Sequence, residues 1–228
     1  MKKLILAFIF LAIFIAGPAH ALQFGFTHIT NNNAGDVTIG ETQLFVDVTD
    51  AGSDQILFTF SNFGPADSAI TKTHFDDDAS VFNTNGIAAI IDGDPGVDFS
   101  IGTNPAQLPG GGSITPAFGE VIPPGSDIKT LANFWAGSQG SPPGVDPGES
   151  LGILFDLEDD FDSVINALNS GNLRIGIHVQ AFTSGGSESF VNNGPTPNPI
   201  PEPATMLLLG CGLVGLAGFG RKKFFKKP

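Results

Sequence analysis

Leu173 to Phe182 reads LRIGIHVQAF, and this stretch decides the fold class of the chain. Apolar residues stand at every second position, and most residues between them are polar. Because successive side chains of a β-strand point to opposite faces, this period predicts a strand with one buried face. The same period recurs at 42–50 and 54–63, and shorter strands are predicted at 24–30, 70–75, 87–92, 97–101 and 150–157.

Turn and helix signals between these strands complete the predicted fold. Asn-Gly, Asp-Gly, Gly-Pro and Gly-Gly pairs favour tight turns and hairpins. One helix is expected at 160–171, where apolar residues share a helical face, Asp160 or Asp162 can cap the start and Gly171 can end it. The sequence therefore predicts an all-β fold, a jelly-roll-like β-sandwich of about 8–10 strands with one short helix.

The N-terminus has the three parts of a secretory signal peptide. Met1-Lys2-Lys3 is a positive start, residues 4–16 are almost entirely apolar, and Ala19-His20-Ala21 is an A-x-A cleavage site. We expect the Sec machinery to export the chain and signal peptidase to remove residues 1–21. A retained anchor is the alternative, which the short apolar run disfavours.

The C-terminus combines an apolar segment with a basic end. Residues 204–220 contain five glycines, which membrane helices tolerate better than soluble ones, and residues 221–228 contain five Lys or Arg. We expect a single transmembrane helix here, with a soluble amphipathic tail as the alternative. Gly, Pro and Asn dominate residues 184–199, which are predicted to be a spacer after a β-sandwich domain at 22–183.

Residues 200–228 resemble the PEP-CTERM sorting signal of Gram-negative bacteria. The resemblance rests on Pro201-Glu202-Pro203, the glycine-rich apolar segment and the basic end, in that order. Ile200 stands where the family most often has Val. The resemblance implies processing at the Pro-Glu-Pro motif by an exosortase, a membrane-embedded cysteine transpeptidase. It implies an inner-membrane-anchored intermediate and then a cell-surface or extracellular fate, often alongside exopolysaccharide and biofilm matrix.

The body between these signals is strongly acidic. It holds 22 of the 23 acidic residues but only Lys72, Lys129 and Arg174 of the ten basic ones. Such a charge repels nucleic acids and attracts divalent cations, so the sequence predicts no nucleic-acid partner. The single cysteine, Cys211, lies in the apolar tail, so the body forms no internal disulfide.

Two groups of aspartates are candidate calcium ligands, because calcium prefers six to eight hard oxygen ligands. The first group is Asp76, Asp77 and Asp78, and the second is Asp92, Asp94 and Asp98. The second departs from the EF-hand pattern, since Val97 replaces the glycine at the sixth position and no Glu closes the loop. The alternative for both groups is that they are solvated turn residues. A third acidic run, at 158–162, lies where a helix start favours negative charge.

The body contains no recognisable catalytic motif. His28, His74 and His178 are far apart in sequence and lack metal-site spacing, and no G-x-S-x-G or phosphate-binding loop occurs. The sequence therefore predicts an exported, non-catalytic cell-surface or extracellular-matrix protein that associates with exopolysaccharide. The alternative is a calcium-dependent carbohydrate-binding module, although Trp135 is the only aromatic residue of the type that usually stacks on sugar rings. A secreted hydrolase is the third hypothesis.

Overall fold

Ten strands and two α-helices form in the residues that the computed structural model describes, which are 21–102, 107–114, 118, 134–139 and 144–195. The strands are β1 (Ala21–His28), β2 (Leu44–Gly52), β3 (Gln55–Asn62), β4 (Ala69–Asp77), β5 (Phe82–Asp92), β6 (Phe99–Ile101), β7 (Phe134–Ser138), β8 (Ser150–Leu157), β9 (Leu173–Gln180) and β10 (Glu188–Pro195). The helices are α2 (Ala34–Gln43) and α3 (Phe161–Ser170), and Gly111–Ser113 forms a 3-10 turn. The predicted all-β class is confirmed.

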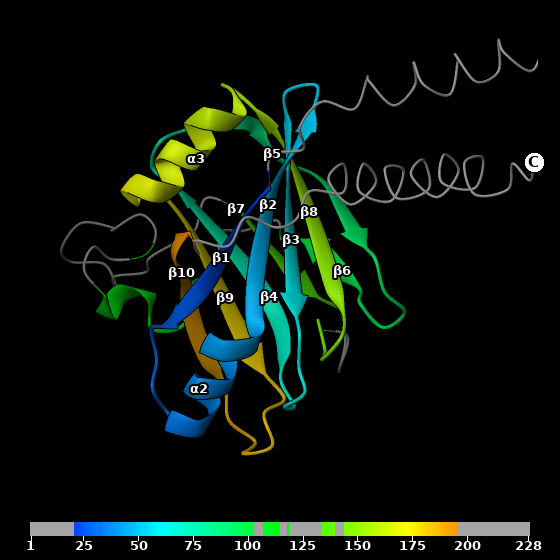
Figure 1. The fold of residues 1–228 in the computed structure, drawn as a ribbon, viewed down its shortest axis with the longest axis vertical. Helices are drawn as coiled ribbons and strands as arrows, with labels where there is room; N and C mark the ends of the chain where they lie inside the picture. Colours follow the sequence, from blue (N-terminus) through cyan, green and yellow to red (C-terminus); the bar gives the residue numbers. More distant parts are fainter. Residues whose placement is uncertain (1–20, 103–106, 115–117, 119–133, 140–143, 196–228) are drawn as a thin grey trace, which may run out of the picture. The chain divides into compact units, whose positions relative to one another are not determined.

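All ten strands belong to one antiparallel sheet in the order β5-β8-β3-β2-β1-β10-β9-β4-β7-β6. The sheet nearly closes, because its two outermost strands, β5 and β6, are consecutive in the chain and the Phe99 N–H donates to Asp92 Oδ1 at 3.2 Å. The two helices lie at opposite ends of the strands (Figure 1). The predicted jelly-roll-like β-sandwich is therefore confirmed only as an all-β fold, since β1 and β10 join the two facing halves into one nearly closed sheet.

The core lies where the two halves of this sheet face each other. Phe58 on β3 and Phe155 on β8 meet Phe75 on β4, with ring centroids 5.1 and 4.8 Å apart. In the sheet order β4 is far from β3 and β8, so these contacts cross the interior rather than follow neighbouring strands. The alternation read from the sequence is confirmed, because Ile56, Phe58 and Phe60 of β3 are fully buried.

Helix α3 confirms the predicted helix. The side chain of Asp160 caps its start by accepting a hydrogen bond from the Ser163 N–H at 2.9 Å. Gly171 ends it in the left-handed conformation, at φ 76°, and its N–H donates to the carbonyls of Ala167 and Leu168. Glycine adopts this conformation with little cost, which makes it the usual residue at a helix end.

Helix α2 corrects the prediction of a single helix. Asn33 caps it by accepting hydrogen bonds from Gly35 and Asp36 N–H. Its sequence, AGDVTIGETQ, has two glycines and no apolar stripe, so neither propensity nor periodicity indicated a helix. The helix is instead held by close packing: a Cβ added at Gly40 would lie 2.1 Å from Phe190 Cζ of β10.

Strand β10 corrects the predicted spacer at 184–199, because Glu188–Pro195 lies inside the sheet between β1 and β9. The Glu188 carboxylate is 1% exposed and accepts hydrogen bonds from the Thr30 hydroxyl and from the N–H groups of Asn32 and Asn33. These contacts anchor a strand that has only one apolar pair, Phe190 and Val191.

Both terminal predictions fall largely outside the described residues. The signal-peptide prediction covers 1–21, of which only Ala21 is described, and the transmembrane and sorting predictions cover 200–228. Within the described part of the chain, neither helix has the length and hydrophobicity needed to cross a membrane.

Candidate functional site

A depression of about 490 Å³ lies between the C-terminal end of α3 and the strands β1 and β10. Leu168, Ile114 and Val191 give it an apolar part. Three residues with carboxamide side chains, Asn169, Asn192 and Asn193, also line it. Asn192 and Asn193 fall in the segment predicted to be a spacer, so no sequence signal pointed to this site.

One wall of the depression is supported by a second, smaller core. Leu108 and Phe118 are completely buried, and Ile29, Ile114 and Val191 pack against them. Gly176 of β9 permits this packing, because a Cβ there would lie 2.4 Å from Leu108 Cδ2. The described residues near 108–118 are therefore fixed on the surface of β9 and β10.

A buried ion pair also borders the depression. Arg174 donates from Nε and Nη2 to Asp76 Oδ2 at 3.1 and 2.5 Å, and the two side chains are 12% and 1% exposed. The guanidinium also lies 5.3 Å from the centre of the Phe118 ring. Asp76 therefore neutralises Arg174, which lines the depression, and holds it in place.

The three aspartates of the first candidate calcium group, Asp76, Asp77 and Asp78, have different structural roles. Asp76 pairs with Arg174, while Asp77 accepts hydrogen bonds from the Val81 and Phe82 N–H groups at 3.2 and 3.0 Å. Asp78 is exposed beyond the end of β4. Asp76 and Asp77 are successive strand residues that point to opposite faces, so the three carboxylates do not converge on one site.

The second candidate group stabilises the connection between β5 and β6. Asp92 accepts from the Phe99 N–H, and Asp94 accepts from the N–H and hydroxyl of Ser150 at 2.8 and 3.0 Å. Asp98 is exposed. Across the described ranges, no group of three or more His, Cys, Asp or Glu residues is placed to hold a metal ion. The arrangement favours the interpretation that these aspartates are turn residues over the hypothesis that they bind calcium.

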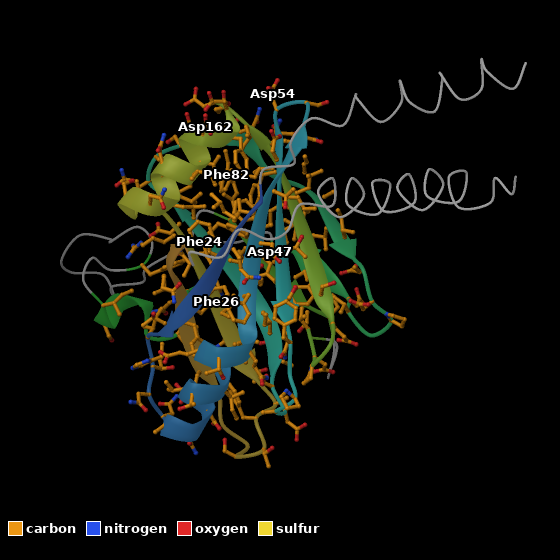
Figure 2. The ribbon with its side chains drawn as sticks, in the orientation of Figure 1. Phe24, Phe26, Asp47, Asp54, Phe82 and Asp162 are labelled. Carbon is orange, nitrogen blue, oxygen red and sulfur yellow. The ribbon has the colours of Figure 1, made fainter. Side chains whose placement is uncertain are left out.

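The third acidic run lies at the end of the domain that carries α3. Asp162 and Asp54, in the turn between β2 and β3, both lie at this end (Figure 2). The hydrogen bond from Ser163 lowers the pKa of Asp160, as expected for a carboxylate that caps a helix. These acids form a charged surface.

Trp135 does not form an isolated sugar-stacking platform. Its ring is half-buried on β7 and stacks on His74 of β4, with centroids 6.2 Å apart and planes 16° apart. His28 lies elsewhere, and its Nδ1 is 2.6 Å from Glu41 Oε1. The hydrogen bonds from His28 lower the pKa of Glu41. His74 and His178 lie two positions apart in register on the paired strands β4 and β9, whereas His28 lies on β1, so within the described residues the three histidines do not form one cluster.

His178 makes stability depend on pH. Its Nδ1 lies 3.1 Å from Ser189 Oγ, and burial together with repulsion from Lys72 lowers its pKa below 6.5. As the pH falls below 6.5, the unfolded chain binds this proton before the folded chain does. The stability associated with neutral, buried His178 is therefore fully present above that pH. It is lost as the pH falls from 6.5 toward the folded-state pKa of His178. Nearby Glu188 opposes the shift but does not reverse it.

We expect His178→Gln to lose less thermal stability than the unmodified protein between about pH 7.5 and pH 5, since glutamine keeps a polar partner for Ser189 but does not titrate. Melting temperatures measured across this range check the prediction. His28→Gln changes an exposed histidine and is the matched control, expected not to reduce the loss. Equal pH slopes for His178→Gln and the unmodified protein would contradict the assignment.

Comparisons with known proteins bear on the C-terminus. The PEP-CTERM protein-sorting motif matches residues 199–222, which include Pro201, Glu202 and Pro203. No curated protein and no solved structure gave a significant match to the chain. The motif implies export, a membrane-anchored precursor, processing by an exosortase and sorting to the cell surface. The chain therefore carries a PEP-CTERM protein-sorting motif at residues 199–222.

Proposed function

We propose that the protein is an exported, non-catalytic component of the cell surface or extracellular matrix, associated with exopolysaccharide. The observation that carries the proposal is the sorting motif at 199–222, which gives the acidic body an outward destination. The predicted signal peptide supports the same route from the other end of the chain. A net charge of −13 further suits a protein exposed to solvent and cations rather than to nucleic acids.

The position of the last strand refines how processing takes place in this proposal. Strand β10 ends at Pro195, and the motif match begins at residue 199. The exosortase therefore acts close to a folded body, without a long stalk between them. Because β10 pairs with β1, the body completes its sheet only after its last residues have crossed the membrane.

A dose-response experiment tests the non-catalytic role. We expect a strain that lacks the gene to form less matrix, and matrix mass to rise in proportion to the amount of protein restored from a titratable promoter. A structural component acts stoichiometrically, whereas an enzyme turns over many substrates. The measurement is matrix dry mass against matrix-bound protein by quantitative immunoblot. Full recovery at a small fraction of the natural protein level would contradict the proposal and favour a secreted enzyme.

A further inference from the structure

We infer that the depression beside the C-terminal end of α3 binds a neutral saccharide through its carboxamide side chains. This rests on the proposed association with exopolysaccharide and names a ligand class and a site for it, and it requires no calcium. Its volume of about 490 Å³ falls within the range of about 300–1,000 Å³ that small-molecule sites occupy. The site combines an apolar surface with a few polar groups, which is also typical of such sites.

The polar groups match hydroxyl groups. Asn169, Asn192 and Asn193 line the depression, and a carboxamide carries two N–H donors and one acceptor oxygen. In Asn192 the oxygen already accepts from the Ile175 N–H and the amide nitrogen donates to the Asn193 carbonyl, so Asn169 and Asn193 are the main candidates for contact with a ligand. A sugar hydroxyl both donates and accepts, so a carboxamide can satisfy either role of the hydroxyl. Ser170 adds a further group of the same kind at the end of α3.

The apolar part matches the C–H face of a sugar ring. Val191 of β10 and Ile114, from the segment packed on that strand, are partly exposed here, and Leu168 of α3, which is 4% exposed, backs them from the core. A ring lying against these side chains would keep its hydroxyl edge toward the asparagines. Contact of this kind excludes water from the apolar face, which favours binding.

Charge selects a neutral ligand over an anionic one. Among the described residues that line the depression there is no Asp or Glu, although the body is strongly acidic. Arg174 is already neutralised by Asp76. The C-terminal end of α3 carries partial negative charge from its carbonyl groups, which disfavours carboxylates and phosphates.

The lining is preorganised. Asn192 Oδ1 accepts a hydrogen bond from the Ile175 N–H at 2.7 Å, and its Nδ2 donates to the Asn193 carbonyl at 3.4 Å, which together fix the side chain. Arg174 is held by two hydrogen bonds to Asp76. Side chains fixed before binding lose less conformational entropy when a ligand arrives.

Gly194 gives the sharpest test. It lines the depression, and a Cβ added there meets no atom within 4 Å, so Gly194→Phe adds a bulky side chain at the site without a clash at its Cβ. We would screen the purified full-length chain in detergent against an array of neutral glucan, mannan, galactan and chitin oligosaccharides, together with uronate-containing ones. We expect binding to at least one neutral class, weaker binding to uronates, and no effect of EDTA. Gly194→Phe is expected to lower affinity at least tenfold in titration calorimetry.

Two further variants separate loss of the site from loss of the fold. Asn193→Ala removes one exposed carboxamide and is expected to weaken binding about fivefold, the equivalent of one hydrogen bond. Gly93→Phe is the matched control, because a Cβ there meets only ordinary contacts and the residue lies outside the depression. It should bind normally. The inference is overturned if no neutral oligosaccharide binds, or if Gly194→Phe and Gly93→Phe bind equally well while both keep the wild-type melting temperature.

Discussion

Replacing Phe75 with alanine is expected to lower the free energy of unfolding by about 3–5 kcal/mol, the usual cost of truncating a buried phenylalanine. Phe75 is completely buried and belongs to β4. Its ring lies 4.8–6.1 Å from those of Phe58, Phe60, Phe82 and Phe155. The substitution leaves a cavity between the two facing halves of the sheet, so it weakens the contact that makes them one domain.

Urea unfolding followed by Trp135 fluorescence measures this change. Trp135 is the only tryptophan, and β7, which carries it, pairs directly with β4. Phe63→Ala is the matched control, because this side chain is 61% exposed. It should change stability by about 0.5 kcal/mol or less. Equal losses for the two variants would contradict the location of the core.

Much of the sheet could be predicted because its central strands carry the period of two. The clearest example is β9, where Leu173, Ile175, Ile177 and Val179 are all completely buried. Helix α3 was predictable for the same kind of reason, since its cap residues and its apolar face are local features of the sequence. Local sequence signals were sufficient to predict β9 and α3 because each of these elements buries one apolar face.

Helix α2 and strand β10 could not be predicted, because contacts distant in sequence hold them. Glu188 of β10 bonds to the segment around Asn32 and Asn33, about 155 residues earlier in the chain. Gly40 weakens the helical signal of α2 and yet allows it to pack on Phe190. In both elements tertiary structure overrides intrinsic propensity.

The candidate site shows the same limit. Clusters of aspartate were visible in the sequence, but the structure assigns Asp76 to an ion pair and Asp94 to a turn. Conversely, Asn169 and Asn193 come from different elements, and only the fold brings both to one depression. The composition of a sequence segment did not reveal whether its polar groups converge.

The sorting motif carries the central claim, and its removal is expected to have an all-or-none effect. We expect the unmodified chain, expressed with an exosortase, to be processed and to reach the cell surface. The triple substitution Pro201→Ala, Glu202→Ala and Pro203→Ala removes the residues that define the recognition site. This variant should therefore accumulate in the membrane fraction as an unprocessed precursor.

Immunoblotting of membrane, periplasmic and surface fractions is the most direct test. Glu158→Ala changes an exposed carboxylate of the body and should be sorted like the unmodified chain. The account predicts that the processed surface form disappears only in the triple variant. Processing and surface delivery of the triple variant at the unmodified level would contradict it.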